Sequence, residues 1–160
     1  MMGITYADIE LIRAADLILV QEGYLTEDEV RQVKVTAQVN LRSSMLVISR
    51  ALARSLDLQL TDRIQLERAD GQVNWADVVG PVEVRFQNRR TSVGAAVLET
   101  ETEVILGTIP LYGMDVMVDP EQAKLTINPK SPERARFFLK QTNRRVGTAH
   151  QPKTDAVKLT

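Results

Sequence analysis

The chain has 160 residues, which is enough for one domain with a proper hydrophobic core. Its 20 Lys and Arg nearly balance its 21 Asp and Glu, and a net charge of -1 gives no general attraction to nucleic acid or to an anionic membrane. There is no cysteine, which excludes disulfides and thiolate metal sites.

The first part of the chain predicts a strand followed by a helical stretch. Residues 4–13 are rich in β-branched side chains, which favours a strand. Residues 14–30 are more helical. Within them, Thr26 and Glu29 have the spacing of a capping box, which predicts that a short helix or turn begins at Thr26.

The next segment has the clearest alternation in the chain. Apolar and polar residues alternate over residues 33–39, which predicts a half-buried strand that ends in a tight turn. After the turn the period changes. Ile48, Leu52 and Leu56 recur at four-residue steps, which predicts one face of a helix, and Ser49 could cap that helix.

Three turn signals divide the rest of the chain into hairpins. Asp70 and Gly71 lie between two apolar segments, and both residues tolerate the positive φ that a tight hairpin turn requires. The polar residues 87–90 predict a second hairpin, and Asp119-Pro120 predicts a third.

These elements predict a mainly β domain over residues 1–140. About eight short strands with one or two short helices favour a closed or folded β-barrel. Residues 141–160 have little apolar periodicity, which predicts a flexible or extended C-terminal tail. The only histidine, His150, lies in that tail, so a Cys-His or Ser-His-Asp site is not expected.

The order and spacing of several segments resemble the retropepsin-like aspartic proteases, and most of all their small, single-domain bacterial members. Residues 35–48 read V-T-A-Q-V-N-L-R-S-S-M-L-V-I, and the family pattern is similar to V-T-A-L-V-D-S-G-A-x-M-L-V-I. The segments 68–71, 80–86 and 105–129 also look like family segments, and the hydrophobic-hydrophobic-Gly signature falls on residues 105–107. The resemblance covers roughly residues 3–140 and implies a retropepsin-like barrel.

The chain departs from the family at the catalytic triplet of Asp, Ser or Thr, and Gly. The matching residues are Asn40, Leu41 and Arg42. Aspartic proteases use two carboxylates that share a proton, and Asn40 cannot serve as the base. Leu41 cannot form the hydrogen bonds that brace the two family turns, and Arg42 places a long charged side chain where a glycine lets substrate approach.

Other residues become candidates for a binding cleft. The resemblance points to Ser43 and Ser44, which follow the turn. Tyr112, near the Ile-Leu-Gly segment, could line a cleft or pack structurally. Arg89 and Arg90 fall on a hairpin turn, where solvent exposure is the first interpretation and ligand contact the second.

Further residues are expected to be structural. The resemblance assigns Gly107 to the signature and gives Asp115 a role in structural ion pairing. Trp75 is expected to be a core or interface aromatic rather than a ligand platform. Phe137 and Phe138 are expected either to pack a last strand or helix onto the core or to dock across a dimer interface.

The expected partners follow from the residues and the resemblance. No cluster has metal-ligand spacing and no glycine-rich phosphate loop is present, so we expect neither a metal nor a cofactor. No signal-like start or stretch of ~20 apolar residues occurs, so we expect a cytoplasmic protein without membrane or nucleic-acid partners.

Two functional hypotheses remain open. The family's site needs two catalytic turns, so the resemblance implies a homodimer, although two copies of Arg42 near the two-fold axis would repel each other. In the first hypothesis this dimer is a pseudoprotease that binds a peptide or protein without cutting it. In the second it is an aspartic endopeptidase that circumvents the lost carboxylate.

Overall fold

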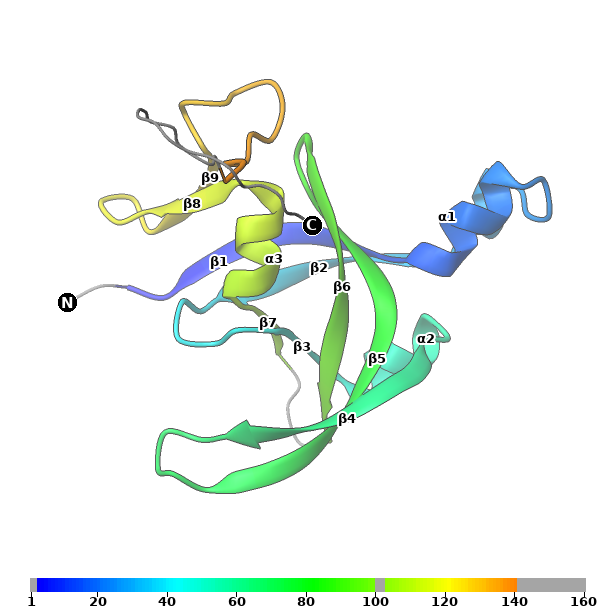
Figure 1. Ribbon diagram of the computed structural model, residues 1–160, viewed down its shortest axis with the longest axis horizontal. Helices are drawn as coiled ribbons and strands as arrows, with labels where there is room; N and C mark the ends of the chain where they lie inside the picture. Colours follow the sequence, from blue (N-terminus) through cyan, green and yellow to red (C-terminus); the bar gives the residue numbers. More distant parts are fainter. Residues whose placement is uncertain (1–2, 100–102, 141–160) are drawn as a thin grey trace, which may run out of the picture.

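The computed structural model describes residues 3–99 and 103–140. Its strands are β1 (Thr5–Arg13), β2 (Gln32–Val39), β3 (Leu46–Ser49), β4 (Gln59–Glu67), β5 (Val73–Phe86), β6 (Arg89–Leu98), β7 (Val104–Leu106), β8 (Val116–Asp119) and β9 (Lys124–Ile127). Strands make up 48% and helices 18% of the structure, and six strands close into a barrel, so the mainly β barrel is confirmed. Around the barrel the order is β1-β2-β7-β3-β6-β5, and β5 pairs back onto β1 (Figure 1).

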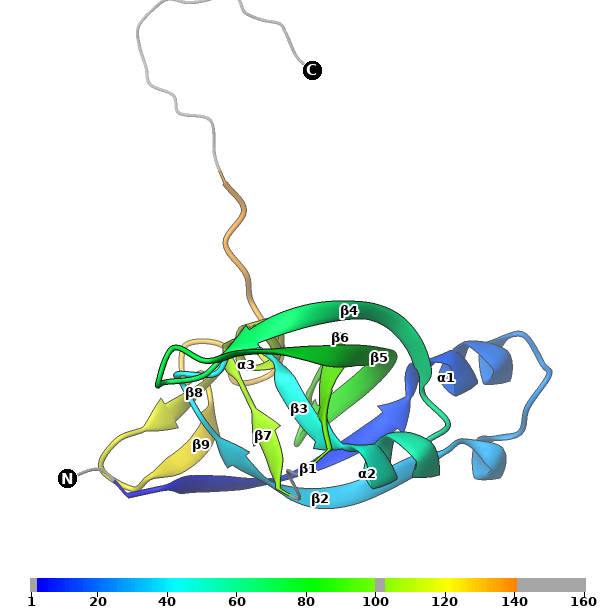
Figure 2. The ribbon, with the colours of Figure 1, turned by 90° about the horizontal axis from the view of Figure 1, so that it is seen from below.

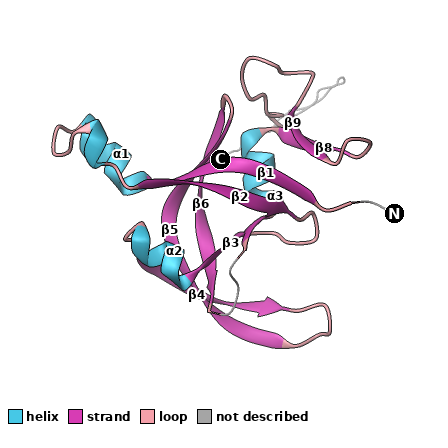
Figure 3. Ribbon diagram, turned by 180° about the vertical axis from the view of Figure 1, so that it is seen from behind, coloured by secondary structure: helices cyan, strands magenta, loops and turns pink. Residues whose placement is uncertain are grey.

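Three short α-helices and one 3-10 turn join these strands, where one or two helices were expected (Figure 3). They are α1 (Ala14–Gln21), η1 (Glu27–Glu29), α2 (Arg50–Ser55) and α3 (Thr108–Met114). The longest, α1, has eight residues. Among the described residues, no helix has both the length and the apolar character needed to cross a membrane.

The core lies inside the barrel and follows the predicted alternation of β2. Ala37 and Val39 are buried, and Val33 and Val35, on the same face, are half-buried and pack against the core. Leu106 of the neighbouring strand β7 is fully buried in the same cluster. The apolar face of β2 therefore sets the register that places the end of this strand beside β7.

The long strand β5 belongs to two parts of the structure. Residues 73–80 pair with β4, and residues 82–85 pair with β1. Gly80 lies where the pairing partner of β5 changes, and it has a φ of +146°, a backbone conformation that residues with a Cβ rarely adopt. The β4–β5 hairpin consequently extends away from the closed barrel, at the bottom of Figure 1. Its tip contains the predicted Asp70-Gly71 turn, with Gly71 at a φ of +86°.

The predicted helix after the 40–42 turn begins later than expected. Ile48 lies buried in β3, and α2 begins only at Arg50. The Ser49 hydroxyl does cap this helix, because it accepts a hydrogen bond from the Leu52 amide at 3.2 Å. An apolar strand that runs straight into a helix produces the same four-residue spacing as a longer helix, which explains the error.

Two expectations for exposed aromatic residues are also corrected. Trp75 lies outside the core, 60% exposed on the β4–β5 hairpin, with the Arg63 guanidinium 5.4 Å from its ring centroid. Phe137 and Phe138 are exposed and belong to no helix or strand, so they do not pack onto the core. The alternative roles, of Trp75 at an interface and of Phe137 and Phe138 at a dimer interface, stay predictions. The predicted tail at 141–160 lies outside the described residues.

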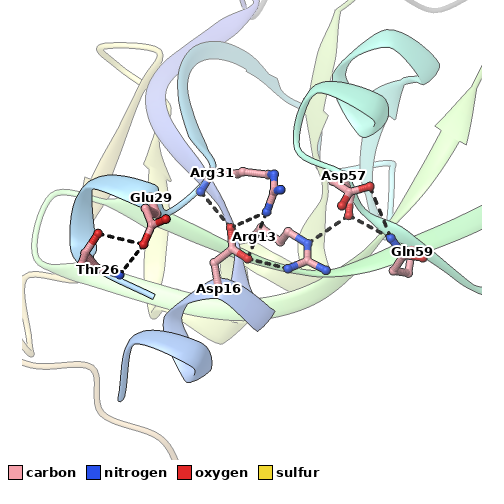
Figure 4. A network of polar contacts seen from close by, with 7 residues as sticks. All are labelled: Arg13, Asp16, Thr26, Glu29, Arg31, Asp57 and Gln59. Carbon is pink, nitrogen blue, oxygen red and sulfur yellow. Dashed lines mark hydrogen bonds and ion pairs between the residues drawn. The ribbon is translucent and has the colours of Figure 1, made fainter. Parts of the chain in front are cut away.

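The buried carboxylate of Asp16 holds together the segment that contains α1 and η1 (Figure 4). The side chain of Asp16 has no exposed surface and contacts Nη1 of Arg13 at 2.5 Å and Nη1 of Arg31 at 3.3 Å. Burial alone would raise the pKa of Asp16, but the hydrogen bond from the Arg31 amide and the two guanidinium groups lower it. Farther along, the Thr26 amide donates to Oε1 of Glu29 at 2.9 Å, which confirms the predicted capping box.

Candidate functional site

The turn between β2 and β3, residues 40–45, rests against the end of β7 and the start of α3. β7 lies between these two strands, parallel to β2 and antiparallel to β3. Four backbone hydrogen bonds fix the turn: Asn40 N to Leu106 O at 3.1 Å, Gly107 N to Met45 O at 3.1 Å, Thr108 N to Ser43 O at 2.9 Å and Ile109 N to Ser44 O at 2.8 Å. The segments 36–49 and 105–107, far apart in the sequence, are therefore joined at one place.

Gly107 is the residue at which these two segments come closest. A Cβ on this residue would lie 2.5 Å from Met45 O, 2.7 Å from Ser43 O and 2.7 Å from Ser44 C. All three are backbone atoms of the turn, so no side-chain rotation could relieve the contact. Its φ of -89° suits any residue, so close packing rather than backbone conformation requires a glycine here.

Asn40 organises the turn through its side chain. Its Oδ1 accepts a hydrogen bond from the Arg42 amide at 2.9 Å, and its backbone oxygen accepts one from the Ser43 amide at 3.2 Å. This is the local bond by which Asn and Asp commonly stabilise turns. The side chain of Asn40 is thus engaged in holding the backbone of the turn.

A cleft of about 350 Å³ lies between this turn and the β4–β5 hairpin. Residues 42–45 line one wall, and residues 65–68 with Asn74 line the other. Val47, Leu98 and Ile105, from three barrel strands, complete the lining. Figure 2, seen from below, shows β4 arching past the barrel strands, and residues at the end of β4 supply the hairpin wall of the cleft.

The structure places Ser43 and Ser44 in the lining of this cleft, and their role in binding stays a prediction. Sequence reasoning did not identify the residues of the hairpin wall, Leu66, Glu67 and Arg68. The Asp70-Gly71 turn predicted the hairpin itself, but nothing local to β4 indicates which way the hairpin folds over the barrel.

An ion-pair network fixes the base of this hairpin to the barrel. Nη2 of Arg50, on α2, lies 2.8 Å from Oδ2 of Asp77 and 2.6 Å from Oε2 of Glu99. Arg63 of β4 lies 3.3 Å from the other oxygen of Asp77. The hydrogen bond from Arg50, with the charges of both arginines, lowers the pKa of Asp77. The network therefore links α2, both hairpin strands and the end of β6.

Three large apolar side chains are exposed on the turn and on α3. Leu41, in the turn, is 56% exposed, and Ile109, whose amide is bonded to the turn, is 53% exposed. Tyr112 lies one helical turn beyond Ile109 and is 73% exposed. Tyr112 does not line the cleft, and its exposure also excludes the structural packing role.

The two candidate arginines lie away from the cleft. Arg89 is not on an exposed turn, since the turn consists of Gln87 and Asn88 and Arg89 is only 2% exposed in β6. Its Nη2 donates to the backbone oxygen of Ser131, while Nε and Nη1 have no partner among the described residues. Arg90 is exposed and lines a different cavity, of about 670 Å³, beside α1.

Asp115 is structural, through hydrogen bonds rather than the predicted ion pair. It ends α3 in the left-handed conformation, with a φ of 56°. Its carboxylate accepts bonds from the Ser131 hydroxyl at 2.6 Å, the Asn128 amide group at 2.9 Å and the Arg136 backbone N–H at 2.9 Å. These bonds, with a smaller contribution from the charge of Arg89, lower the pKa of Asp115 to about 2.

Among the described residues, no group of three or more His, Cys, Asp or Glu side chains is placed to hold a metal ion. The chain matches no protein-family model, and no curated protein is significantly similar to it.

Proposed function

We propose that this protein is a catalytically inactive, retropepsin-like homodimer that binds an extended peptide in the cleft between the 40–45 turn and the β4–β5 hairpin. The observation that carries the proposal is the insertion of β7 between β2 and β3. It brings together the two segments on which the resemblance rests, and it leaves a cleft of about 350 Å³ beside them.

The chemistry of the turn supports binding without hydrolysis. Peptide cleavage by this family needs two carboxylates that share one proton. Asn40 offers an amide whose oxygen already accepts from the Arg42 backbone, and an amide does not titrate near neutral pH. Of the described residues that line the cleft, Glu67 alone is acidic, and it belongs to the hairpin rather than to the turn.

The exposed residues around the turn support pairing of two copies. Leu41, Ile109 and Tyr112 give this surface an apolar character that a second copy would cover. A two-fold interface uses the same patch on both subunits, so one apolar patch is sufficient. Arg42 lies beside Leu41, and solvent, an acidic side chain or an anionic ligand would have to separate the two copies of its charge.

The first test measures cleavage and binding on the same preparation. We expect no pepstatin-sensitive hydrolysis of a mixed peptide library between about pH 3 and 7, the range in which a carboxylate dyad holds one proton. We expect saturable binding of labelled peptides that Ser44→Trp weakens, because Ser44 lines the cleft. Ser92→Trp, at an exposed residue beside the other cavity, is the matched control. Robust cleavage by pure protein that Asn40→Ala abolishes would overturn the proposal.

Light scattering at micromolar concentration tests the dimer. We expect a dimer whose mass falls to that of a monomer in Ile109→Asp, because a charge would have to be buried in the interface. Ile18→Asp is the matched control, since Ile18 is 54% exposed but lies on α1. A monomeric parent protein, or equal effects of the two variants, would contradict a dimer through this surface.

A further inference from the structure

The cleft carries one arginine on each of its two walls. Arg42 belongs to the turn and Arg68 to the β4–β5 hairpin, and both line the cavity. Within residues 3–99 and 103–140, neither arginine takes part in an ion pair. Glu67 is the one acidic residue among the described residues of the lining, so these residues place two positive charges and one negative charge around the cleft.

Both arginines are held at their backbones, and their charged ends remain available. The Arg42 amide donates to Asn40 Oδ1 at 2.9 Å. The Arg68 amide donates to Gln72 O at 2.7 Å, and its Nε donates to Asn74 Oδ1 at 2.9 Å. The bond to Asn74 orients the guanidinium and leaves both Nη atoms of Arg68 without a hydrogen-bond partner in the described part of the chain. Such a guanidinium can bind a carboxylate through two parallel hydrogen bonds.

The rest of the lining indicates what else a ligand would carry. Met45, Val47, Leu98 and Ile105 give the cleft an aliphatic surface. No Phe, Tyr or Trp is among the described residues that line it. Single-stranded nucleic acids are held mainly by stacking of bases on aromatic side chains, so this surface is better suited to a peptide than to an oligonucleotide.

We propose that the cleft selects acidic peptides, in which an Asp or Glu side chain lies between Arg42 and Arg68 and neighbouring aliphatic side chains contact the barrel strands. This inference rests on the proposed peptide-binding function and names its ligand class. It also assigns a role to Arg42, which stands where the resembled family has a glycine. In that family the glycine lets substrate approach the turn, whereas the side chain of Arg42 would supply a positive charge that recognises the ligand.

The test compares three fluorescein-labelled heptapeptides by fluorescence anisotropy with the full chain. Their residues are Ala, Val, Leu, X, Val, Leu and Ala, with X as Glu, Gln or Lys. We expect the Glu peptide to bind about tenfold more tightly than the Gln peptide, as one charge-assisted contact would give, and the Lys peptide to bind weakest. The preference should shrink in high salt, because both arginines lie at an open cleft.

The double variant Arg42→Gln, Arg68→Gln should bind the Glu and Gln peptides equally, because it removes both positive charges that distinguish Glu from Gln. Arg90→Gln, which removes an exposed arginine outside the cleft, should keep the full preference. Equal binding of Glu and Gln peptides by the parent, or an unchanged preference in the double variant, would overturn the acidic selectivity while leaving peptide binding intact. Failure of all three peptides, with tight binding of a single-stranded oligonucleotide, would overturn both proposals.

Discussion

Replacing Gly107 with alanine should destabilise the protein more than the same change at Gly3 or at Gly94. The new Cβ would lie 2.5 Å from Met45 O, so the turn or β7 would have to move by about 0.9 Å to restore an ordinary contact of 3.4 Å. The same movement would stretch the 2.8 Å bond from Ile109 N to Ser44 O to about 3.7 Å, beyond hydrogen-bond range. Overpacking costs about 1–3 kcal/mol, and each lost backbone bond about 1 kcal/mol.

We therefore expect Gly107→Ala to lower the free energy of unfolding by about 2–4 kcal/mol, which corresponds to a decrease in Tm of roughly 10 °C for a domain of this size. Urea unfolding followed by circular dichroism measures this loss. Two matched variants calibrate it. Gly3→Ala places its Cβ in open space. In Gly94→Ala the close contact, at 2.9 Å, is with a methyl group of the Val78 side chain, and the nearest backbone atom, Val79 O, is 3.9 Å away. A loss under about 1 kcal/mol at Gly107, or a larger loss at Gly94, would refute the close-contact reasoning.

Three further outcomes follow from the same structure. Asp115→Asn keeps the left-handed backbone but removes a carboxylate whose folded pKa is about 2, below the ordinary 3.8. In the parent, the stability that this carboxylate contributes above pH 3.8 is lost as the pH falls toward 2. The free energy of unfolding measured with urea should therefore depend less on pH in this window in the variant than in the parent. Asp16→Ala leaves two arginines without their buried partner and should cost about 3 kcal/mol, while Glu22→Ala, at an exposed residue just after α1, should cost almost nothing in the same assay. The triple variant Asn40→Asp, Leu41→Ser, Arg42→Gly should stay folded and show a pH–stability profile shifted toward acid relative to the parent. The two aspartates of the proposed dimer would share a proton, which raises the pKa of one of them, so the stability from this proton is present at low pH and is lost as the pH rises through the raised pKa; an unfolded variant, or a titration like that of an isolated exposed carboxylate, would count against the retropepsin-like turn.

Local patterns were sufficient to predict the features that depend on neighbouring residues. The capping box at Thr26 and the Asp70-Gly71 hairpin were found where the sequence placed them. α3 was missed because Pro110 and Gly113 argue against a helix. Pro110 occupies the first turn, where its missing N–H costs nothing, and a Cβ on Gly113 would lie 2.4 Å from Thr91 Oγ1. A helix that packs this closely on β6 depends on a partner that is distant in the sequence.

Arg89 illustrates the same limit for the candidate site. A polar run between two strands predicts an exposed turn, and two arginines in succession strengthen that expectation. The chain turns at Gln87 and Asn88 instead, and the alternation of β6 then directs Arg89 inward and Arg90 outward. A shift of the turn by one residue would thus exchange the buried and the exposed arginine. The backbone oxygen of Ser131, which accepts the hydrogen bond from Arg89, lies far along the chain.

In the turn at residues 40–45, the backbone geometry and the side-chain chemistry depend on different residues. Neither Leu41 nor Arg42 has a positive φ, so the backbone of this turn does not require the glycine of the family's triplet. Asn40 supplies the bond that holds the loop, and aspartate could supply the same bond through a carboxylate oxygen. The structural constraint therefore falls on Gly107, which faces the turn, while residues 40–42 are free to differ in chemistry. The strand insertion, the hairpin and the cleft can therefore exist without an aspartate at residue 40, because none of these features depends on a carboxylate there.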